Sequence, residues 1–496
     1  MEMNRETVSF LDPVLQEVRN TEVTQQVKLT DGMPDIGRIL GSWGQVILRG
    51  KQWQDGEAEI NGGILVWVLY VPEDGTRERC IDSWIPFRMK WDLPEEIGEG
   101  TLRVRCLTRF VDGRSVSPRK IMVRCGIGAM AEGFVQAQQD IHVPSELPEE
   151  VELLENTYPL RLMKEAGEKL FVMDEDLTLP DSAPQPEKLI CWRMEPRIAD
   201  SRVLGDKLAF RGNGNLHILY RSEEGQLHSW DFPLAFSQVT ELEQEFGGDA
   251  QGDLAPAVTS LEVELDEEGH IRMKCAVAAQ YRIVDRQMVS LAEDAYSPWR
   301  ELTMHKEELE LPVVLEQRRE NLYGEQTVPA EANVVADVNF LPDFPRQRRN
   351  DAGLELEYPG IFQVLYYGSD GTLHGSNARW EGRQILKSAG ESILSSVPIP
   401  GEPMALTGSD QIQVKAELPV DMTATTRQRI PMVTAVEMGQ LRQADPDRPA
   451  LILRRAGEKR LWDIAKDSGS RVEDIRRANG LKGEPEPEQM LLIPVR

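Results

Sequence analysis

A strand-and-turn pattern that occurs three times constrains this chain more than any other feature of its sequence. Each copy is a β-prone stretch ending in Leu-Tyr, followed by an acidic residue and by a glycine five positions after the tyrosine. The copies are Gly63–Gly75, Gly214–Gly225 and Gly360–Gly371. An Asp-Gly or Glu-Gly pair after a strand predicts a hairpin turn, because glycine accepts a positive φ. We therefore expect three copies of one β-rich unit, in which these tyrosines and glycines are structural.

A second landmark strengthens the repeat in the first two copies. Cys125 lies 55 residues after Tyr70, and Cys275 lies 55 residues after Tyr220, each in a similar apolar strand. In the third copy the expected counterpart of this strand is Arg429–Val433, at a different spacing. Equal offsets at two landmarks favour a duplicated unit over a chance likeness between hairpins.

Composition shifts predict where the units end. Thr178–Glu187 has three prolines in ten residues, which is typical of an extended spacer, and Asp445–Pro449 precedes a segment of different pattern. We expect a mainly β protein with three β-sandwich-like repeat units and a small α+β domain at the C-terminal end. The expected ranges are 1–177, 188–305 and 306–440 for the units and 450–496 for the last domain.

The charge balance argues against two classes of partner. The 496 residues include 83 Asp+Glu and 56 Lys+Arg, for a net charge of −27. Such a field repels nucleic acid and anionic lipid, and the longest purely apolar run, Ile64–Val71, is far shorter than the roughly 20 residues that span a bilayer. The start of the chain, Met1–Glu6, also lacks the pattern of a signal peptide. We predict a cytoplasmic protein with no nucleic-acid partner and no membrane insertion.

The cysteines and histidines point to no catalytic or metal site. The five cysteines include no CxxC pair, which indicates core thiols in a reducing compartment. His217 replaces the Trp67 and Gln363 of the other copies, while His228 and His374 each follow a repeat tyrosine by eight residues and are expected to flank the turn. Motifs of metalloproteases, serine hydrolases and P-loop enzymes are absent from the sequence. We predict no enzyme activity, no cofactor and no metal ion.

The last 46 residues follow another pattern. Leu451–Arg454 reads as a strand, Leu461–Ala465 as the start of an amphipathic helix, and Met490–Pro494 as a final strand. Ser470 and Glu473 form a predicted capping box for a second helix, which Asn479-Gly480 ends. The segment therefore predicts a strand–helix–helix–strand (βααβ) order. It holds ten Lys+Arg and eight Asp+Glu, so its charge is +2 and the rest of the chain carries −29.

This segment resembles a LysM domain. The matching residues are Gly457, Leu461–Ala465, Asn479–Leu481, Pro487, Gln489, Leu491, Ile493 and Pro494. The resemblance implies a LysM core of Leu461, Trp462, Ile464, Ile475, Leu491 and Ile493. It also implies binding loops that contain Gly457, Glu458, Lys459, Arg460, Asn479, Gly480, Leu481, Glu488 and Gln489. Glu458–Arg460 and Glu488 depart from the family pattern in the loops that line its glycan groove, which counts against a glycan ligand and leaves a protein ligand open.

The large N-terminal part is similar to the SPOCS domains of spore coat proteins. The similarity rests on Leu29–Leu40, Leu48–Gly50 and Val68–Tyr70, with a partial version at Pro196–Ile198. SPOCS units followed by a LysM domain are typical of spore coat morphogenetic proteins of clostridial-type spore formers. This implies a scaffold in the mother-cell cytoplasm, at the forespore surface, which binds the ATPase of the coat basement layer and other coat proteins. The alternative is a protein of the cell or spore wall whose LysM domain binds peptidoglycan through N-acetylglucosamine.

Overall fold

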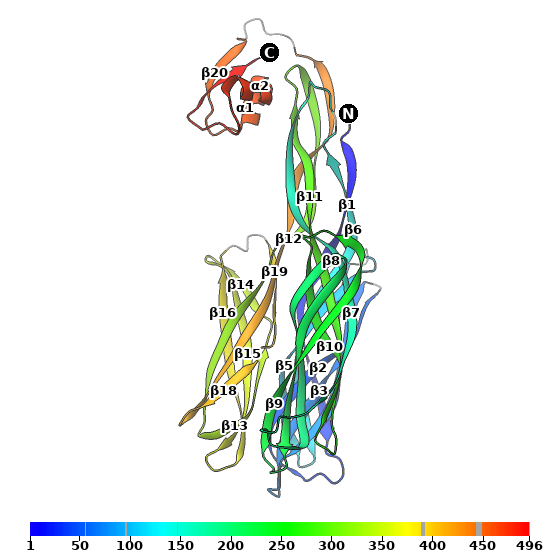
Figure 1. Cartoon of the computed structure of the whole chain (residues 1–496), viewed down its shortest axis with the longest axis vertical. Helices are drawn as coiled ribbons and strands as arrows, with labels where there is room; N and C mark the ends of the chain where they lie inside the picture. The colour runs from blue at the N-terminus through cyan, green and yellow to red at the C-terminus, as the bar shows by residue number, and fades with distance from the viewer. Residues whose placement is uncertain (55, 95–96, 146, 388–391, 443–448, 496) are drawn as a thin grey trace.

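A computed structural model describes the chain except for residues 55, 95–96, 146, 388–391, 443–448 and 496. Most of the predicted linker Asp445–Pro449 therefore lies outside the described residues. The expected mainly β class is confirmed, because strands account for most of the chain and the described helices are two short ones near its C-terminal end (Figure 1). Across the described residues, no helix has the length and apolar character needed to cross a membrane.

The first unit is a sandwich of two three-stranded antiparallel sheets. One sheet has the order β2-β3-β4 and the other the order β1-β6-β5, and their facing apolar side chains form one core. The strands are β1 (Asn4–Lys28), β2 (Ile36–Gln54), β3 (Glu57–Pro72), β4 (Arg79–Asp92), β5 (Thr101–Ser117) and β6 (Lys120–Val143).

The second unit repeats this arrangement. Its strands are β7 (Glu152–Leu177), β8 (Pro186–Ser222), β9 (Leu227–Phe246), β10 (Gln251–Leu265) and β11 (Ile271–Tyr296). The sheet β10-β11-β7 faces the pair β8-β9. β8 folds back on itself at Gly205, which has a φ of +64°. Its two halves lie so close together that a Cβ on Gly212 would be 2.0 Å from the carbonyl oxygen of Arg197. β8 thus corresponds to β2 and β3 together.

The third unit has the same two sheets with two of its strands broken. Its strands are β12 (Arg300–Pro329), β13 (Ala332–Pro342), β14 (Arg346–Asn350), β15 (Gly353–Gly368), β16 (Leu373–Leu386), β17 (Ile393–Pro398), β18 (Pro403–Thr407) and β19 (Gln411–Leu441). β13 and β14 share one edge of β15, and β17 and β18 share one edge of β19. This unit has its own core of buried apolar residues.

Strand pairing divides the chain at different places from the predicted boundaries. Each unit pairs its first strand with its last: β1 with β6, β7 with β11, and β12 with β19. The units therefore span 4–143, 152–296 and 300–441, so 152–177 belongs to the second unit and 300–305 to the third. The proline-rich Thr178–Glu187 lies inside the second unit: residues 178–185 connect β7 to β8, and Pro186 and Glu187 begin β8. Proline is as suitable for a turn between sheets as for a spacer.

Pairing also corrects the third copy of the cysteine strand. Cys125 and Cys275 are buried, four residues after Ile121 and Ile271, which begin or nearly begin the return strand of each unit. In the third unit the residue equivalent to Ile121 and Ile271 is Ile412, which pairs with Val328 near the start of β19. The predicted counterpart Arg429–Val433 is wrong, because it lies much farther along the same strand. The equivalent residue Ile412 is 46 residues after Tyr366, whereas the spacing in the first two copies is 51.

The leucine of each Leu-Tyr repeat holds the three units together. Leu69, Leu219 and Leu365 are at most 2% exposed and lie in one cluster with residues of all three units. Tyr70 and Tyr220, in contrast, are buried in the cores of their own units. The turn glycines Gly75, Gly225 and Gly371 have φ values of 71°, 89° and 76°, as the hairpin prediction requires. His228 and His374 pair across the turn with Tyr220 and Tyr366, so their predicted place beside the turn is confirmed.

The outer ends of the first and last strands of each unit form a stalk beyond the sandwiches (Figure 1). Its core joins apolar residues of all six strands: Val8, Phe10, Ile141, Leu160, Leu162, Val289, Leu291, Leu309, Leu311, Val313, Ile430 and Met432. A second, smaller cluster of Leu11, Phe134, Met163, Val284 and Val314 continues this core toward the sandwiches. The three units thus share apolar cores in the stalk and between the sandwiches.

A buried ion network connects the first two units. Glu132 accepts from Arg103 at 2.6 Å and from Arg282 at 2.8 Å, and Asp253 lies 3.0 Å and 2.8 Å from the same guanidinium groups. Arg282 also donates to Thr423 of the third unit at 2.7 Å. Burial opposes the ionisation of Glu132, but the charges of Arg282 and Arg103 keep its pKa below the ordinary value. All three units therefore meet at Arg282.

Replacing Arg282 by Met should destabilise the protein by about 3–5 kcal/mol, because the buried Glu132 and the partly buried Asp253 would then share only Arg103. The measurement is the free energy of unfolding from guanidinium titration. The matched control is Arg272→Met on the same strand, whose side chain is 70% exposed and which should change stability by about 0.5 kcal/mol or less. Equal effects of the two substitutions would contradict a central role for the network.

Candidate functional site

The C-terminal segment consists of a two-stranded sheet and two short helices. β20 (Leu451–Arg455) pairs antiparallel with β21 (Met490–Pro494), and α1 (Leu461–Ser468) and α2 (Val472–Asn479) lie between them in the chain. α1 begins where the Leu461 amide donates to Glu484 at 2.6 Å, and Gly480, with a φ of 62°, ends α2. The assignment of these elements to a LysM domain stays a prediction.

The predicted capping box is wrong. α2 has Arg471 at its N-cap, and no side-chain cap hydrogen bond is made there. Ser470 is 1% exposed, and its carbonyl oxygen accepts from the Tyr296 hydroxyl of β11 at 2.8 Å. The sequence pattern was misleading because Ser470 contacts another part of the chain instead of its own helix.

The six residues predicted as the core of this segment are buried. Leu461, Ile464, Ile475, Leu491 and Ile493 are 0% exposed, and Trp462 is 6% exposed. They form one cluster that also includes Tyr296 of the second unit. The Trp462 and Tyr296 rings meet edge to face, with centroids 4.8 Å apart. Trp462 is therefore a core residue and also a contact to the stalk.

Polar contacts fix the segment to the stalk end of the second unit. Asp294 of β11 accepts from the Trp462 indole at 2.9 Å and from Lys466 at 2.6 Å, while Glu152 of β7 accepts from Arg471 at 2.7 Å. Burial opposes the ionisation of Asp294, but hydrogen bonds from Lys466 and Trp462 lower its pKa. The two carboxylates join the basic C-terminal segment to the acidic body.

Several predicted binding-loop residues hold the loops in shape. Asn479 donates to the carbonyl oxygens of Ile475 and Leu492 and accepts from the Leu492 amide. The backbone of Gly457 bonds to Pro487, and Gly457 and Gly480 have the positive φ values that turns need. The Gln489 side chain accepts from the Glu486 amide at 3.3 Å, and Leu481 packs against the cluster around Trp462.

The exposed members of the predicted loops are in ion pairs within the segment. Lys459 contacts Asp467 at 2.6 Å and Arg460 contacts Asp463 at 3.2 Å. Glu488 pairs with Arg455, and Glu458 is exposed. Whether this surface binds a ligand stays a prediction, because these contacts describe the segment alone.

The outer face of the two-stranded sheet is apolar and exposed. Leu453 and Leu492 lie opposite each other and are 63% and 39% exposed, and Leu451 and Met490 beside them are 53% and 51% exposed. Successive side chains of a strand point to opposite faces, so Ile452, Leu491 and Ile493 pack inward. We call Leu451, Leu453, Met490 and Leu492 the outer apolar face. Sequence alternation could have indicated it, but the same residues also read as core.

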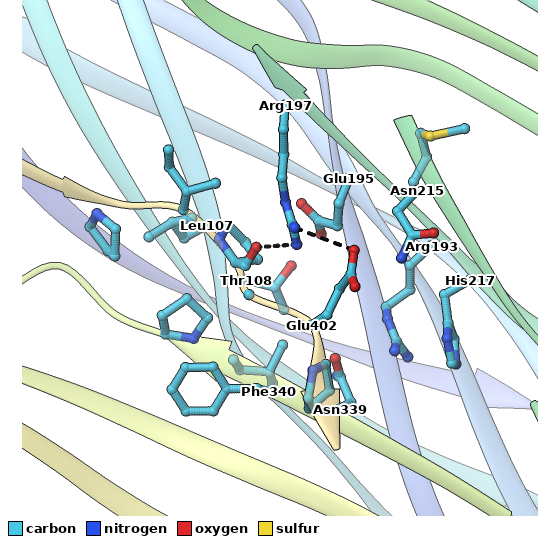
Figure 2. A pocket seen from close by; sticks show the side chains of 18 of the residues that line it. Leu107, Thr108, Arg193, Glu195, Arg197, Asn215, His217, Asn339, Phe340 and Glu402 are labelled. Carbon is cyan, nitrogen blue, oxygen red and sulfur yellow. Dashed lines mark hydrogen bonds and ion pairs between the residues drawn. The ribbon is translucent and has the colours of Figure 1, made fainter. Parts of the chain in front are cut away.

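A second candidate site is a cavity of about 510 Å³ between the three units (Figure 2). Its lining comes from β2, β5, β8, β9, β10, β12 and β13, from the stretch that runs from the end of β17 through β18, and from Asp421 of β19. The segment Pro196–Ile198, which was expected to match the SPOCS pattern in part, lies in this wall within β8. The expected equivalent in the first unit, Leu29–Leu40, begins before β2. No sequence pattern indicates the cavity, because it forms where segments remote in the chain meet.

His217 occupies one side of this cavity. Its Nδ1 lies 3.0 Å from Asp231 and its Nε2 lies 2.8 Å from Asp337 of the third unit. Burial and the charge of Arg193 oppose protonation, but Asp337 and Asp231 raise the pKa of the imidazole above its ordinary value. His217 therefore connects the second and third units by polar contacts, where the first copy has the apolar Trp67.

The cysteines are free, as predicted, and Cys125, Cys191 and Cys275 are buried. Burial raises the pKa of Cys80 and Cys106 to about 12, so these half-buried thiols stay protonated near neutral pH. Among the described residues, no group of three or more His, Cys, Asp or Glu side chains is placed to hold a metal ion.

Comparison with known proteins adds no relative to this picture. No family model, no curated protein and no solved structure matches the chain.

Replacing Asp294 by Ala should weaken the docking of the C-terminal segment by about 1–3 kcal/mol, because the Trp462 indole would lose its buried acceptor. The expected result is faster hydrogen exchange in residues 292–297 and 461–472. The control Asp467→Ala removes an exposed ion pair on α1, the helix that contains Trp462, and should leave these exchange rates unchanged. Identical exchange in all three proteins would show that the polar contacts do not hold the segment.

The effect of Asp294 should also depend on pH. Its pKa is lowered in the docked state, so its contribution is complete above the ordinary carboxyl pKa of about 4 and disappears as the pH falls through the lowered value. The difference between the parent protein and Asp294→Ala should therefore be largest near neutral pH and shrink below about pH 4. Small-angle scattering across this range measures whether the two proteins converge, and a constant difference would rule out ionised Asp294 as the contact.

Proposed function

We propose that this protein is a non-enzymatic scaffold for assembly of the spore coat, with SPOCS-like units as its body and a LysM-like module at residues 450–496. Its site of action is the forespore surface, on the mother-cell side. Its partners are the ATPase of the coat basement layer and other coat proteins. The observation that carries the proposal is the outer apolar face, which lies on a small module docked at the end of a long body.

The outer apolar face has the character of a protein contact. Four large apolar side chains on one small sheet are 39% to 63% exposed. Contiguous exposed apolar surface of this kind marks sites of protein association. Arg455 lies opposite Met490 at the edge of the face and is paired with Glu488, so the four apolar side chains carry the contact.

The body fits the task of holding this module away from a surface. Three sandwiches lie side by side, and the stalk that they share ends where the module docks (Figure 1). The docking contacts come from β7 and β11, whose pairing continues down to the sandwich of the second unit. A load on the module would thus be transmitted to the body through a continuous pair of strands.

The predicted binding loops favour a protein ligand over N-acetylglucosamine polymers. Lys459, Arg460 and Glu488, which could contact sugar hydroxyls, are held in ion pairs. Trp462 is unavailable for stacking on a sugar ring, because it faces Tyr296 and Asp294. A peptidoglycan-binding protein of the cell or spore wall remains the alternative function.

The double substitution Leu453→Glu and Leu492→Glu should abolish capture of the purified coat ATPase by the full-length protein. Two carboxylates in an apolar contact lose their hydration without a partner, so we expect affinity to fall by at least about tenfold. The measurement is biolayer interferometry with the immobilised ATPase, and equal melting temperatures would show that the module stays folded. The control Leu170→Glu changes a side chain of β7 that is 63% exposed and should bind normally.

Sedimentation with purified peptidoglycan separates the two functions. The scaffold proposal expects no pelleting of the full-length protein above background. Strong pelleting that disappears in a protein ending at Pro449, together with unaltered ATPase capture by the double variant, would favour the wall-binding alternative.

A further inference from the structure

One wall of the cavity between the units is formed where a strand of the third unit is divided. In the first two units, the strands β5 and β10 run without interruption beside β6 and β11. The equivalent strand of the third unit is divided into β17 and β18 by residues 399–402, with Pro398, Pro400 and Pro403 at the break. The segment stays beside β19, where the Ile399 amide donates to the carbonyl oxygen of Pro419 at 2.8 Å. It holds one residue more than the stretch of β19 opposite it, which makes it a bulge, and it forms part of the cavity wall.

The middle of the cavity is apolar. Leu107 of the first unit, Met194 of the second and Phe340 and Leu341 of the third line its walls. A volume of about 510 Å³ lies in the range of small-molecule sites, which are roughly 300–1,000 Å³. The space can accept an aliphatic side chain with a short length of backbone.

An arginine at the mouth is occupied by a carboxylate of the same chain. Arg197 donates to the carbonyl oxygen of Pro400 at 2.6 Å and lies 3.4 Å from Glu402, which is 67% exposed (Figure 2). The Nε of Arg197 is buried and has no hydrogen-bond partner among the described residues. Glu195 lines the same wall, and burial raises its pKa. Arg197 can therefore exchange the exposed Glu402 for the carboxylate of a ligand.

A second arginine lies deeper in the wall with an unused donor. Arg193 is 7% exposed, and within the described structure its Nη1 has no hydrogen-bond partner. The nearest carboxylate oxygen, Oδ2 of Asp337, is 3.9 Å away, which is too long for a hydrogen bond. Arg193 and Arg197 are four residues apart on β8, a separation of about 13 Å along a strand. Buried donors of this kind call for an acceptor, so a ligand held at Arg197 can present a second acceptor to Arg193.

We propose that this cavity binds the carboxyl-terminal end of a peptide, about two residues long with an aliphatic last side chain. The terminal carboxylate takes the place of Glu402 at Arg197. The aliphatic side chain lies among Leu107, Met194 and Phe340, and a backbone carbonyl reaches toward Arg193. The same chemistry is carried by a free short peptide and by the tail of a protein.

Calorimetric titration of the full-length protein with acetyl-Ala-Leu tests the proposal, and acetyl-Ala-Leu amide is the matched ligand without the carboxylate. We expect the acid to bind at least about tenfold more tightly than the amide, since a charge-assisted pair contributes roughly 1.5–3 kcal/mol. A twelve-residue peptide ending in Ala-Leu forms the second arm. Binding of both acids identifies a protein tail, and binding of the dipeptide alone identifies a small ligand.

Two substitutions act in opposite directions. Arg197→Gln should lower the affinity for acetyl-Ala-Leu by about tenfold. Glu402→Gln removes the competing carboxylate and should raise this affinity several-fold, a gain that misfolding cannot produce. Glu381→Gln, at an exposed carboxylate of the same unit, should have no effect. Equal affinity for acid and amide, or no binding at 10 mM by either the parent protein or Glu402→Gln, would overturn the proposal (the concentration is about tenfold above a weak Kd of 1 mM).

Discussion

The pairing of the first strand of each unit with its last strand determines the rest of the structure. It returns the chain to the end of the unit from which it started, so the start and the finish of every unit lie at the same end. Only short segments separate Val143 from Glu152 and Tyr296 from Arg300. The units must therefore lie side by side, with six strand ends at one place. Those ends are apolar on one face and bury it against one another as the stalk.

This closure explains which part of the fold could be predicted from the sequence. The hairpin Gly63–Gly75 and its two copies are local, and a turn glycine five residues after a tyrosine is visible in one chain. The unit boundaries are not local, because they depend on which distant strand pairs with β7 and β12. Prolines in Thr178–Glu187 indicated a break in regular structure, and composition alone does not distinguish a break between units from one within a unit.

The same limit applies to the candidate site. The core of the C-terminal segment could be predicted, since Leu461, Ile464 and Ile475 follow helical periodicity. The partner of Trp462 could not, because Asp294 is 168 residues away and is one of many acidic residues in the body. Asn479 was expected to contact a ligand and instead holds the loop to β21. A polar loop residue can satisfy the backbone or a ligand, and only the fold decides which.

The positions that are alike in the three copies, and those that differ, together indicate where function can reside. The shared cores use equivalent residues of the copies, as Leu69, Leu219 and Leu365 do, and such positions cannot change without loosening all three units. The positions that differ are free of this constraint. At one of them His217 and Asp337 replace apolar packing, and at another the prolines around 399–402 line the cavity. The third copy, the least similar in sequence, thus contributes distinct residues to the cavity wall, while its first and last strands keep the shared role in the stalk.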